Sequence, residues 1–186
     1  MNSRLVDKLR VNIYPNRAKM GKDAAKDIAN CFKSLLKKKK SINVIFAAAP
    51  SQNDVLLSLV KDKSIPWNKI NAFHMDEYIG LSKDAPQCFK NFLNAHLFSL
   101  VPFKSVNVLN SEANPKAEIK RYSKLLKNHP ADIVVLGIGE NGHIAFNDPP
   151  VADFKDKAMI KIVKLDKVCR QQQVNNSPRY VVENML

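Results

Sequence analysis

The sequence predicts an α/β fold: a doubly wound, mostly parallel sheet flanked by helices. Short apolar runs alternate along the chain with segments of helical periodicity, and strands that alternate with helices form parallel sheets. Two runs, residues 44–49 and 133–138, are apolar at nearly every position, as expected for strands covered on both faces. The chain has 186 residues, the length of one ordinary domain, so we expect a single domain over residues 1–186.

The expected elements follow from these patterns. Strands are expected at residues 9–14, 41–49, 69–75, 105–109, 132–137 and 158–165, and helices at 16–40, 51–60, 85–100 and 114–128. The first helix rests on apolar residues spaced three or four apart. Ser51 is expected to cap the second helix, and Pro115 suits the first turn of the last one. Ligands of such folds bind at the carboxyl ends of the strands, so the stretches after residues 49, 75 and 137 matter most.

Charge and composition narrow the range of partners. Thirty basic residues against 17 acidic ones give a net charge of +13, and the densest run is residues 37–40. Such a run can mark an anionic partner such as nucleic acid, or it can end a helix, where cations suit the dipole. A protein that binds single-stranded nucleic acid uses aromatic side chains among its basic residues. No aromatic residues interleave with this run, so nucleic acid is not the expected partner. A positive field can still attract an anionic metabolite.

The compartment is expected to be the cytoplasm. No stretch reaches the roughly 20 apolar residues of a membrane span, so no membrane is expected as a partner. The N-terminus lacks the apolar region of a signal peptide. Three cysteines without C-x-x-C spacing indicate neither a disulfide framework nor a zinc site.

A glycine-rich loop follows the apolar run at 132–137. Its glycines, at 137, 139 and 142, match the dinucleotide pattern G-x-G-x-x-G, but Pro149 and Pro150 stop any helix within two turns, which argues against a nicotinamide site. The loop carries a polar cluster of Glu140, Asn141, His143, Asn147 and Asp148. A histidine oriented by a carboxylate makes an acid/base pair, whereas a simpler interpretation is that these side chains cap their own loop.

Two adjacent carboxylates, Asp76 and Glu77, follow the expected strand at 69–75. Successive side chains on a strand point to opposite faces, so the two should not share one role, and Glu77 is the more structural of the pair. A carboxylate in a partly dry pocket has a raised pKa, which suits a general base. Taken alone, the pair also fits an ordinary acidic end of a strand.

Together the two stretches, F-x-M-D-E-Y-x-G-L and G-x-G-x-x-G-H-I-A-F-N-D-P, closely resemble the glucosamine-6-phosphate isomerase/deaminase family. The resemblance covers roughly residues 41–180. It implies conversion of glucosamine 6-phosphate, a small sugar phosphate, to fructose 6-phosphate and ammonia, in amino-sugar metabolism, with no redox cofactor or catalytic metal. By the same resemblance, Asp76 takes the C2 proton and returns it to C1, and His143 assists ring opening. Asn141 and Asp148 stand where the family places two acidic residues around that histidine.

The phosphate site departs from the family pattern. Where the family has a T-G-G-T-like loop, this chain has A-A-A-P-S-Q over residues 47–52. Pro50 has no N–H to donate, and Ala49 is less free than glycine to turn its amide, so phosphate binding through Ser51 and Gln52 is expected to be altered or weaker. Arg170 matches a family arginine that contacts the phosphate.

Family members also continue past the position of Leu186, so the resemblance implies a chain that lacks the last elements of the sheet. Family enzymes are often oligomeric, which makes a homo-oligomer an expectation as well. Two alternatives stay open: a weakened or non-catalytic sugar-phosphate binder, and a hydrolase like 6-phosphogluconolactonase. That related branch shares a glycine-rich G-H segment but lacks M-D-E-Y and the F-N-D-P ending.

Overall fold

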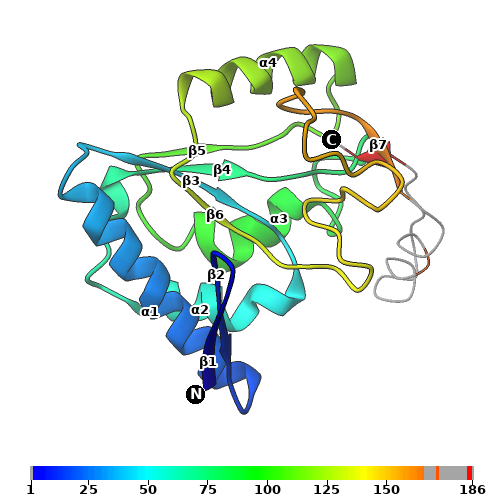
Figure 1. Cartoon of the computed structure of the whole chain (residues 1–186). Coiled ribbons are helices and arrows are strands. Elements are labelled where there is room, and N and C mark those ends of the chain that lie inside the picture. Colours follow the sequence, from blue (N-terminus) through cyan, green and yellow to red (C-terminus); the bar gives the residue numbers. More distant parts are fainter. Residues whose placement is uncertain (1, 166–170, 172–183, 186) are drawn as a thin grey trace.

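A four-stranded parallel sheet forms the centre of the protein in a computed structural model, which describes residues 2–165, 171 and 184–185. Its strands are β3 (Ile42–Phe46), β4 (Ile70–His74), β5 (Ser105–Asn107) and β6 (Ile133–Val135), in the order β5-β4-β3-β6 (Figure 1). Ile45 lies opposite Phe73 on one side and Val134 on the other. The predicted α/β class is therefore confirmed.

Helices cover both faces of the sheet. On one face lie α1 (Arg17–Leu36), α2 (Asn53–Lys61) and α3 (Phe89–Leu93), which continues as the π-helix η3 (Asn94–Phe98); α4 (Pro115–Asn128) lies on the other face (Figure 1). Two 3-10 turns, η1 (Pro50–Gln52) and η2 (Trp67–Lys69), precede α2 and β4. Asn16 and Asn114 cap α1 and α4 through their side-chain oxygens, which satisfies amides that the first turn leaves unpaired. Within the described residues, no helix combines the length and the apolarity needed to cross a bilayer.

Each layer of helices has its own apolar core. The larger core joins α1, α2 and η3 to the sheet through buried side chains such as Phe32, Phe46 and Leu56. The smaller core packs α4 on the other face through Phe73, Leu109, Tyr122 and Leu126. Burial on both faces explains why β4 is buried at all five positions.

Helices α1 and α2 pack unusually closely at Gly21. A Cβ added there would lie 2.4 Å from the Cβ of Asp54, a distance that no packed pair of carbons adopts. Glycine usually weakens a helix interior, so its presence in α1 is explained by this contact.

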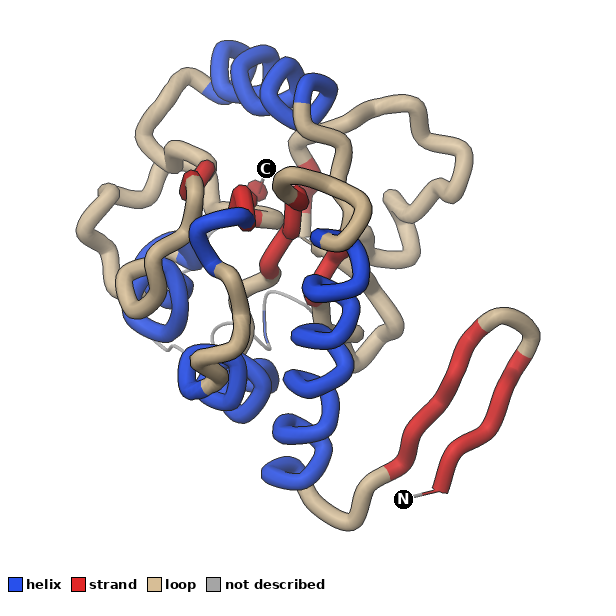
Figure 2. Tube along the Cα trace, turned by 90° about the vertical axis from the view of Figure 1, so that its left-hand side faces the viewer, coloured by secondary structure: helices blue, strands red, loops and turns tan. Residues whose placement is uncertain are grey.

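Several expected elements differ from the structure. The strand predicted at 9–14 exists as β2 (Leu9–Ile13), but it pairs with β1 (Asn2–Val6) in a hairpin separate from the main sheet, and Figure 2 shows that hairpin projecting from the body. The strand predicted at 158–165 shrinks to β7 (Val163–Lys164), which pairs antiparallel with β8 (Asn184–Met185). The helix predicted at 85–100 begins only at Phe89, because residues 85–88 form a turn.

The predicted cap at Ser51 is also wrong. Ser51 lies inside the turn η1, and Gln52 stands at the cap of α2 without a side-chain hydrogen bond to it. The cause is Pro50, which suits the first position of a short helix and so starts the turn before Ser51 can act as a cap.

The strand order creates a crevice. The chain passes from β3 outward to β4 and β5, and then returns to place β6 on the opposite side of β3. The β3–β4 connection through α2 and the β5–β6 connection through α4 therefore lie on opposite faces of the sheet (Figure 1), and open α/β sheets bind ligands at such a switch point, beyond the carboxyl ends of the strands.

Candidate active site

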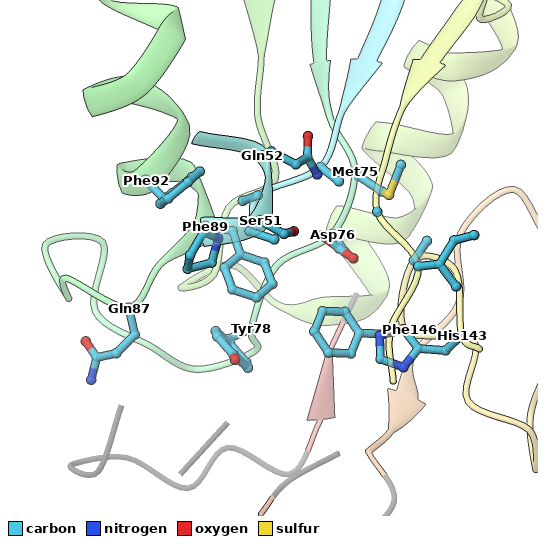
Figure 3. A pocket seen from close by; sticks show the side chains of 18 of the residues that line it. Ser51, Gln52, Met75, Asp76, Tyr78, Gln87, Phe89, Phe92, His143 and Phe146 are labelled. Carbon is cyan, nitrogen blue, oxygen red and sulfur yellow. The ribbon is translucent and has the colours of Figure 1, made fainter. Parts of the chain in front are cut away.

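A cavity of about 640 Å³ lies at this switch point. The three stretches that the sequence singled out all contribute to it, from the ends of β3, β4 and β6 (Figure 3). The lining residues are Ala47, Ala48, Ala49, Pro50, Ser51, Gln52, Met75, Asp76, Tyr78, Leu81, Pro86, Gln87, Phe89, Phe92, Gly137, Ile138, Gly139, Glu140, His143, Ala145 and Phe146.

Backbone hydrogen bonds hold the three stretches together beyond the strands. Ala47 N–H donates to the Val135 carbonyl over 3.0 Å, and Met75 N–H donates to the Phe46 carbonyl over 3.1 Å. The ladder thus continues by one residue on either side of β3, so the loops leave the sheet from a common edge.

Asp76 lies in the wall of the cavity, with a side chain pointing into it (Figure 3). The residue is only 7% exposed. Burial, and to a smaller extent the neighbouring Glu77, raises the pKa of Asp76 from 3.8 to about 7, because a dry site disfavours the charged form. A carboxyl with this pKa can exist in both protonation states near neutral pH.

Glu77 points elsewhere, as the alternation along a strand predicts. It is fully buried, is not part of the cavity lining, and accepts hydrogen bonds from the backbone amides of Tyr78, Phe89 and Lys90. The adjacent carboxylates therefore have separate roles, as expected.

His143 reaches the opposite side of the cavity and is oriented by two residues. Its Nδ1 lies 2.7 Å from Asn141 Oδ1 and 3.2 Å from Asp148 Oδ1. Asn141 Nδ2 donates to the same Asp148 oxygen over 2.9 Å, which turns the amide oxygen of Asn141 toward the ring. Both neighbours of Nδ1 are acceptors, so Nδ1 carries the proton and Nε2 is left as the proton acceptor of the neutral ring.

The backbone around His143 is shaped to seat this ring. A Cβ on Gly139 would lie 2.2 Å from His143 Cε1, so only glycine lets the imidazole rest against the chain. Ala145 and Phe146 both adopt left-handed φ angles of 50°, a conformation that costs non-glycine residues about 1–3 kcal/mol each. Such strain gathers where the surrounding structure imposes a geometry that function needs.

The phosphate-site candidates lie at the N-terminal end of α2. Ser51 is exposed at the cavity, whereas Gln52 is 5% exposed. Both amide atoms of Gln52 are buried and have no hydrogen-bond partner among the residues that the structure describes. Buried polar atoms are almost always paired, so this amide is suited to a polar group of a ligand. Arg170 lies outside the described residues.

The structure also settles the surroundings of other polar residues. His74, which the sequence left open between pocket and core, is 1% exposed and absent from the cavity lining, and burial lowers its pKa to about 3. The side chain of Asn147 caps its own loop through the carbonyls of Ile144 and Ala145. Within the described ranges, no group of three or more His, Cys, Asp or Glu could hold a metal ion.

Sequence reasoning missed one wall of the cavity. Tyr78, Gln87, Phe89 and Phe146 line it, yet none stands at the end of a strand. The aromatic residues in and near the two motifs could have predicted this wall, since large apolar side chains commonly line ligand sites. No feature of the sequence points to Gln87 as a lining residue.

Comparison with known proteins places the chain in a family. Residues 15–167 match the family model described as glucosamine-6-phosphate isomerases/6-phosphogluconolactonase. A glucosamine-6-phosphate deaminase of Streptococcus sanguinis is 37% identical over 118 residues, which cover 62% of this chain and 50% of the relative. Another, from Lactobacillus delbrueckii subsp. bulgaricus, is 32% identical over 142 residues, covering 76% and 58%.

Solved structures agree with this placement. A monomeric glucosamine-6-phosphate deaminase of the NagB superfamily superposes with a TM-score of 0.80 at 26% identity, covering 91% of this chain and 71% of that one. A 6-phosphogluconolactonase of Thermotoga maritima gives 0.71 at 21% identity, covering 89% and 71%; that likeness shows the fold alone. The chain spans about half the length of the Streptococcus sanguinis and Lactobacillus delbrueckii deaminases that it matches.

Fold and cavity together define a doubly wound α/β protein whose switch point holds a cavity lined by a buried carboxyl and a histidine. The matched family model covers most of that fold and both motifs. The chain belongs to the glucosamine-6-phosphate isomerase/6-phosphogluconolactonase family.

Proposed function

We propose that the protein is an amino-sugar-phosphate isomerase/deaminase, which converts glucosamine 6-phosphate and water to fructose 6-phosphate and ammonia. The observation that carries the proposal is Asp76, a buried carboxyl in the cavity wall whose pKa is raised to about 7. The sequence similarity to glucosamine-6-phosphate deaminases supports the choice of this reaction.

Asp76 has the properties that proton transfer between neighbouring carbons requires. Ionised, it removes the proton from C2 of the open-chain sugar; protonated, it returns that proton to C1. Carbon 2 then becomes an imine, which water hydrolyses to the ketone with release of ammonia. A pKa near the working pH favours both half-steps, and the buried position keeps the proton from water.

His143 is suited to opening the sugar ring before that transfer. With Nδ1 held as a donor by Asn141 and Asp148, Nε2 can accept the proton of the anomeric hydroxyl and pass it to the ring oxygen as the bond between C1 and that oxygen breaks. The imidazolium that forms is stabilised by the Asp148 carboxylate, which is 1% exposed.

The phosphate is proposed to bind at the N-terminal end of α2, where backbone amides and the helix dipole favour an anion. Ser51 supplies a hydroxyl, and Gln52 supplies a buried amide that no described residue pairs with; Arg170 stays a prediction from sequence. Pro50 supplies no N–H, so we expect weaker phosphate binding than with a glycine loop.

The test is formation of ammonia and fructose 6-phosphate from glucosamine 6-phosphate by the purified protein. We expect turnover that Asp76→Asn abolishes and that Asp84→Asn, which removes an exposed carboxylate, leaves unchanged. Turnover that persists in Asp76→Asn would refute the role of Asp76, and no turnover by folded protein would refute the enzymatic proposal.

The altered phosphate loop supports one second candidate, a sugar-phosphate binder without catalysis. Ala49 and Pro50 stand in the cavity wall where backbone amides are expected to hold the phosphate. Calorimetric titration with glucosamine 6-phosphate separates the two candidates, because a binder gives heat of binding without ammonia.

A further inference from the structure

The side chain of Glu77 is fully buried, and both oxygens of its carboxylate accept hydrogen bonds. Oε1 accepts the amides of Tyr78 over 2.9 Å and Phe89 over 3.1 Å, and Oε2 accepts the amide of Lys90 over 3.0 Å. Burying a carboxylate is costly unless hydrogen bonds and charge offset it. The charged and titratable groups that interact with Glu77 are Asp76, Cys88 and Lys90.

These three hydrogen bonds close a loop that forms one wall of the cavity. The bond to Tyr78 lies at the start of the loop, and the bonds to Phe89 and Lys90 lie at its end, where α3 begins. Five residues of this segment line the cavity: Tyr78, Leu81, Pro86, Gln87 and Phe89. The peptide bond joins the start of the wall to Glu77 at the end of β4, and the carboxylate binds the far end of the wall, at Phe89 and Lys90, to the same point beside Asp76.

Aromatic contacts extend this connection to the far side of the cavity. The rings of Phe89 and Phe146 stack with centroids 5.8 Å apart and planes 15° from parallel. Phe146 in turn stacks on His143 at 5.3 Å and 19°. Tyr78 packs against Phe89 at 4.8 Å, and Figure 3 shows the rings in a row from Tyr78 and Phe89 through Phe146 to His143.

We propose that Glu77 is the positioning residue of this site: its carboxylate fastens the wall between Tyr78 and Phe89, and through the Phe89–Phe146 stack it holds His143 in place relative to Asp76. Glu77 does not line the cavity, so it acts through its neighbours and not on the substrate. This role rests on the proposed functions of Asp76 and His143. It explains why Glu77, a second carboxylate, is buried next to Asp76.

The variant Glu77→Gln tests the proposal without a substrate. A glutamine offers one acceptor oxygen, and its NH₂ group meets amides that need an acceptor, so the end of the wall at Phe89 and Lys90 is held less firmly. We expect the amides of Tyr78, Phe89 and Lys90 to exchange with solvent at least about tenfold faster, equivalent to about 1.4 kcal/mol. Asp84→Asn, in the same loop but exposed, is the matched control and should leave these amides unchanged.

Two further readouts distinguish positioning from general stability. The carboxyl carbon of Asp76, followed by NMR, should titrate at lower pH in Glu77→Gln, because the neighbouring negative charge is gone. The ring signals of His143 should also move, although Glu77 does not contact it. Exchange within twofold of the wild type, with unmoved Asp76 and His143 signals, would overturn the proposal.

A second variant covers the case in which Glu77→Gln does not fold. Glu77→Asp keeps the charge on a shorter arm, so it should release Phe89 and Lys90 while leaving the Asp76 titration near that of the wild type. Unchanged exchange at those amides in Glu77→Asp would refute the proposal as well. All these readouts use ligand-free protein, so they stand even if glucosamine 6-phosphate proves not to be the substrate.

Discussion

The buried carboxyl of Asp76 should make the folded protein less stable as pH rises, and Asp76→Asn should remove that loss. Asp76 has a pKa raised from 3.8 to about 7 in the folded state, so the folded state binds more protons than the unfolded state between these values. The free energy of unfolding therefore falls as pH rises through this window and levels off above about pH 7. At about 1.4 kcal/mol per pKa unit, the rise from 3.8 to about 7 is worth at most about 4 kcal/mol.

Urea unfolding between pH 4.5 and 8.5 measures this effect. Trp67, the sole tryptophan, is buried and reports on unfolding by fluorescence. The stability advantage of Asp76→Asn over the wild type should grow with pH up to about pH 7, whereas Asp84→Asn should show no such growth. Parallel pH curves for Asp76→Asn and the wild type would refute the argument that Asp76 is held in a dry, unfavourable site.

Three further substitutions test contacts around the site. Gly139→Ala should displace the imidazole of His143 and lower kcat by about 100-fold, while the exposed control Asp84→Asn should have little effect in the same assay. Tyr122→Phe should lower the free energy of unfolding by about 1–3 kcal/mol, because its buried hydroxyl bonds the backbone at the end of β4; a pH-independent loss in urea unfolding checks this. Gly21→Ala should destabilise the protein by about 1–3 kcal/mol through overpacking of α1 against α2, and a higher melting temperature would contradict the packing described.

The sequence predicted which segments line the cavity because the topology of a parallel sheet fixes where the strands end. The edge of a parallel sheet brings together the residues that follow each strand, so Asp76, His143 and Ser51 could be expected near one another from strand ends alone. The helix α4 and its cap at Asn114 likewise follow from local signals, a polar cap followed by proline.

Other features depend on contacts distant in sequence and could not be predicted locally. The role of Glu77 needs the amides of residues 89 and 90 to fold back onto it. The close approach at Gly139 needs the imidazole of His143 to lie across it. The strand at Leu9–Ile13 has a clear pattern, but the pattern does not say which neighbour it pairs with, and so the hairpin was missed.

The pH dependence of kcat/KM on glucosamine 6-phosphate tests the central claim most directly, because kcat/KM reports the ionisation of groups in the free enzyme, the state to which the raised pKa of Asp76 refers. We expect kcat/KM to rise with pH through about pH 7, as Asp76 ionises, and Asp76→Asn to remove this rise together with the activity. A rise near pH 4, the range of an ordinary carboxyl, or one that survives in Asp76→Asn, would contradict the assignment of Asp76 as the base.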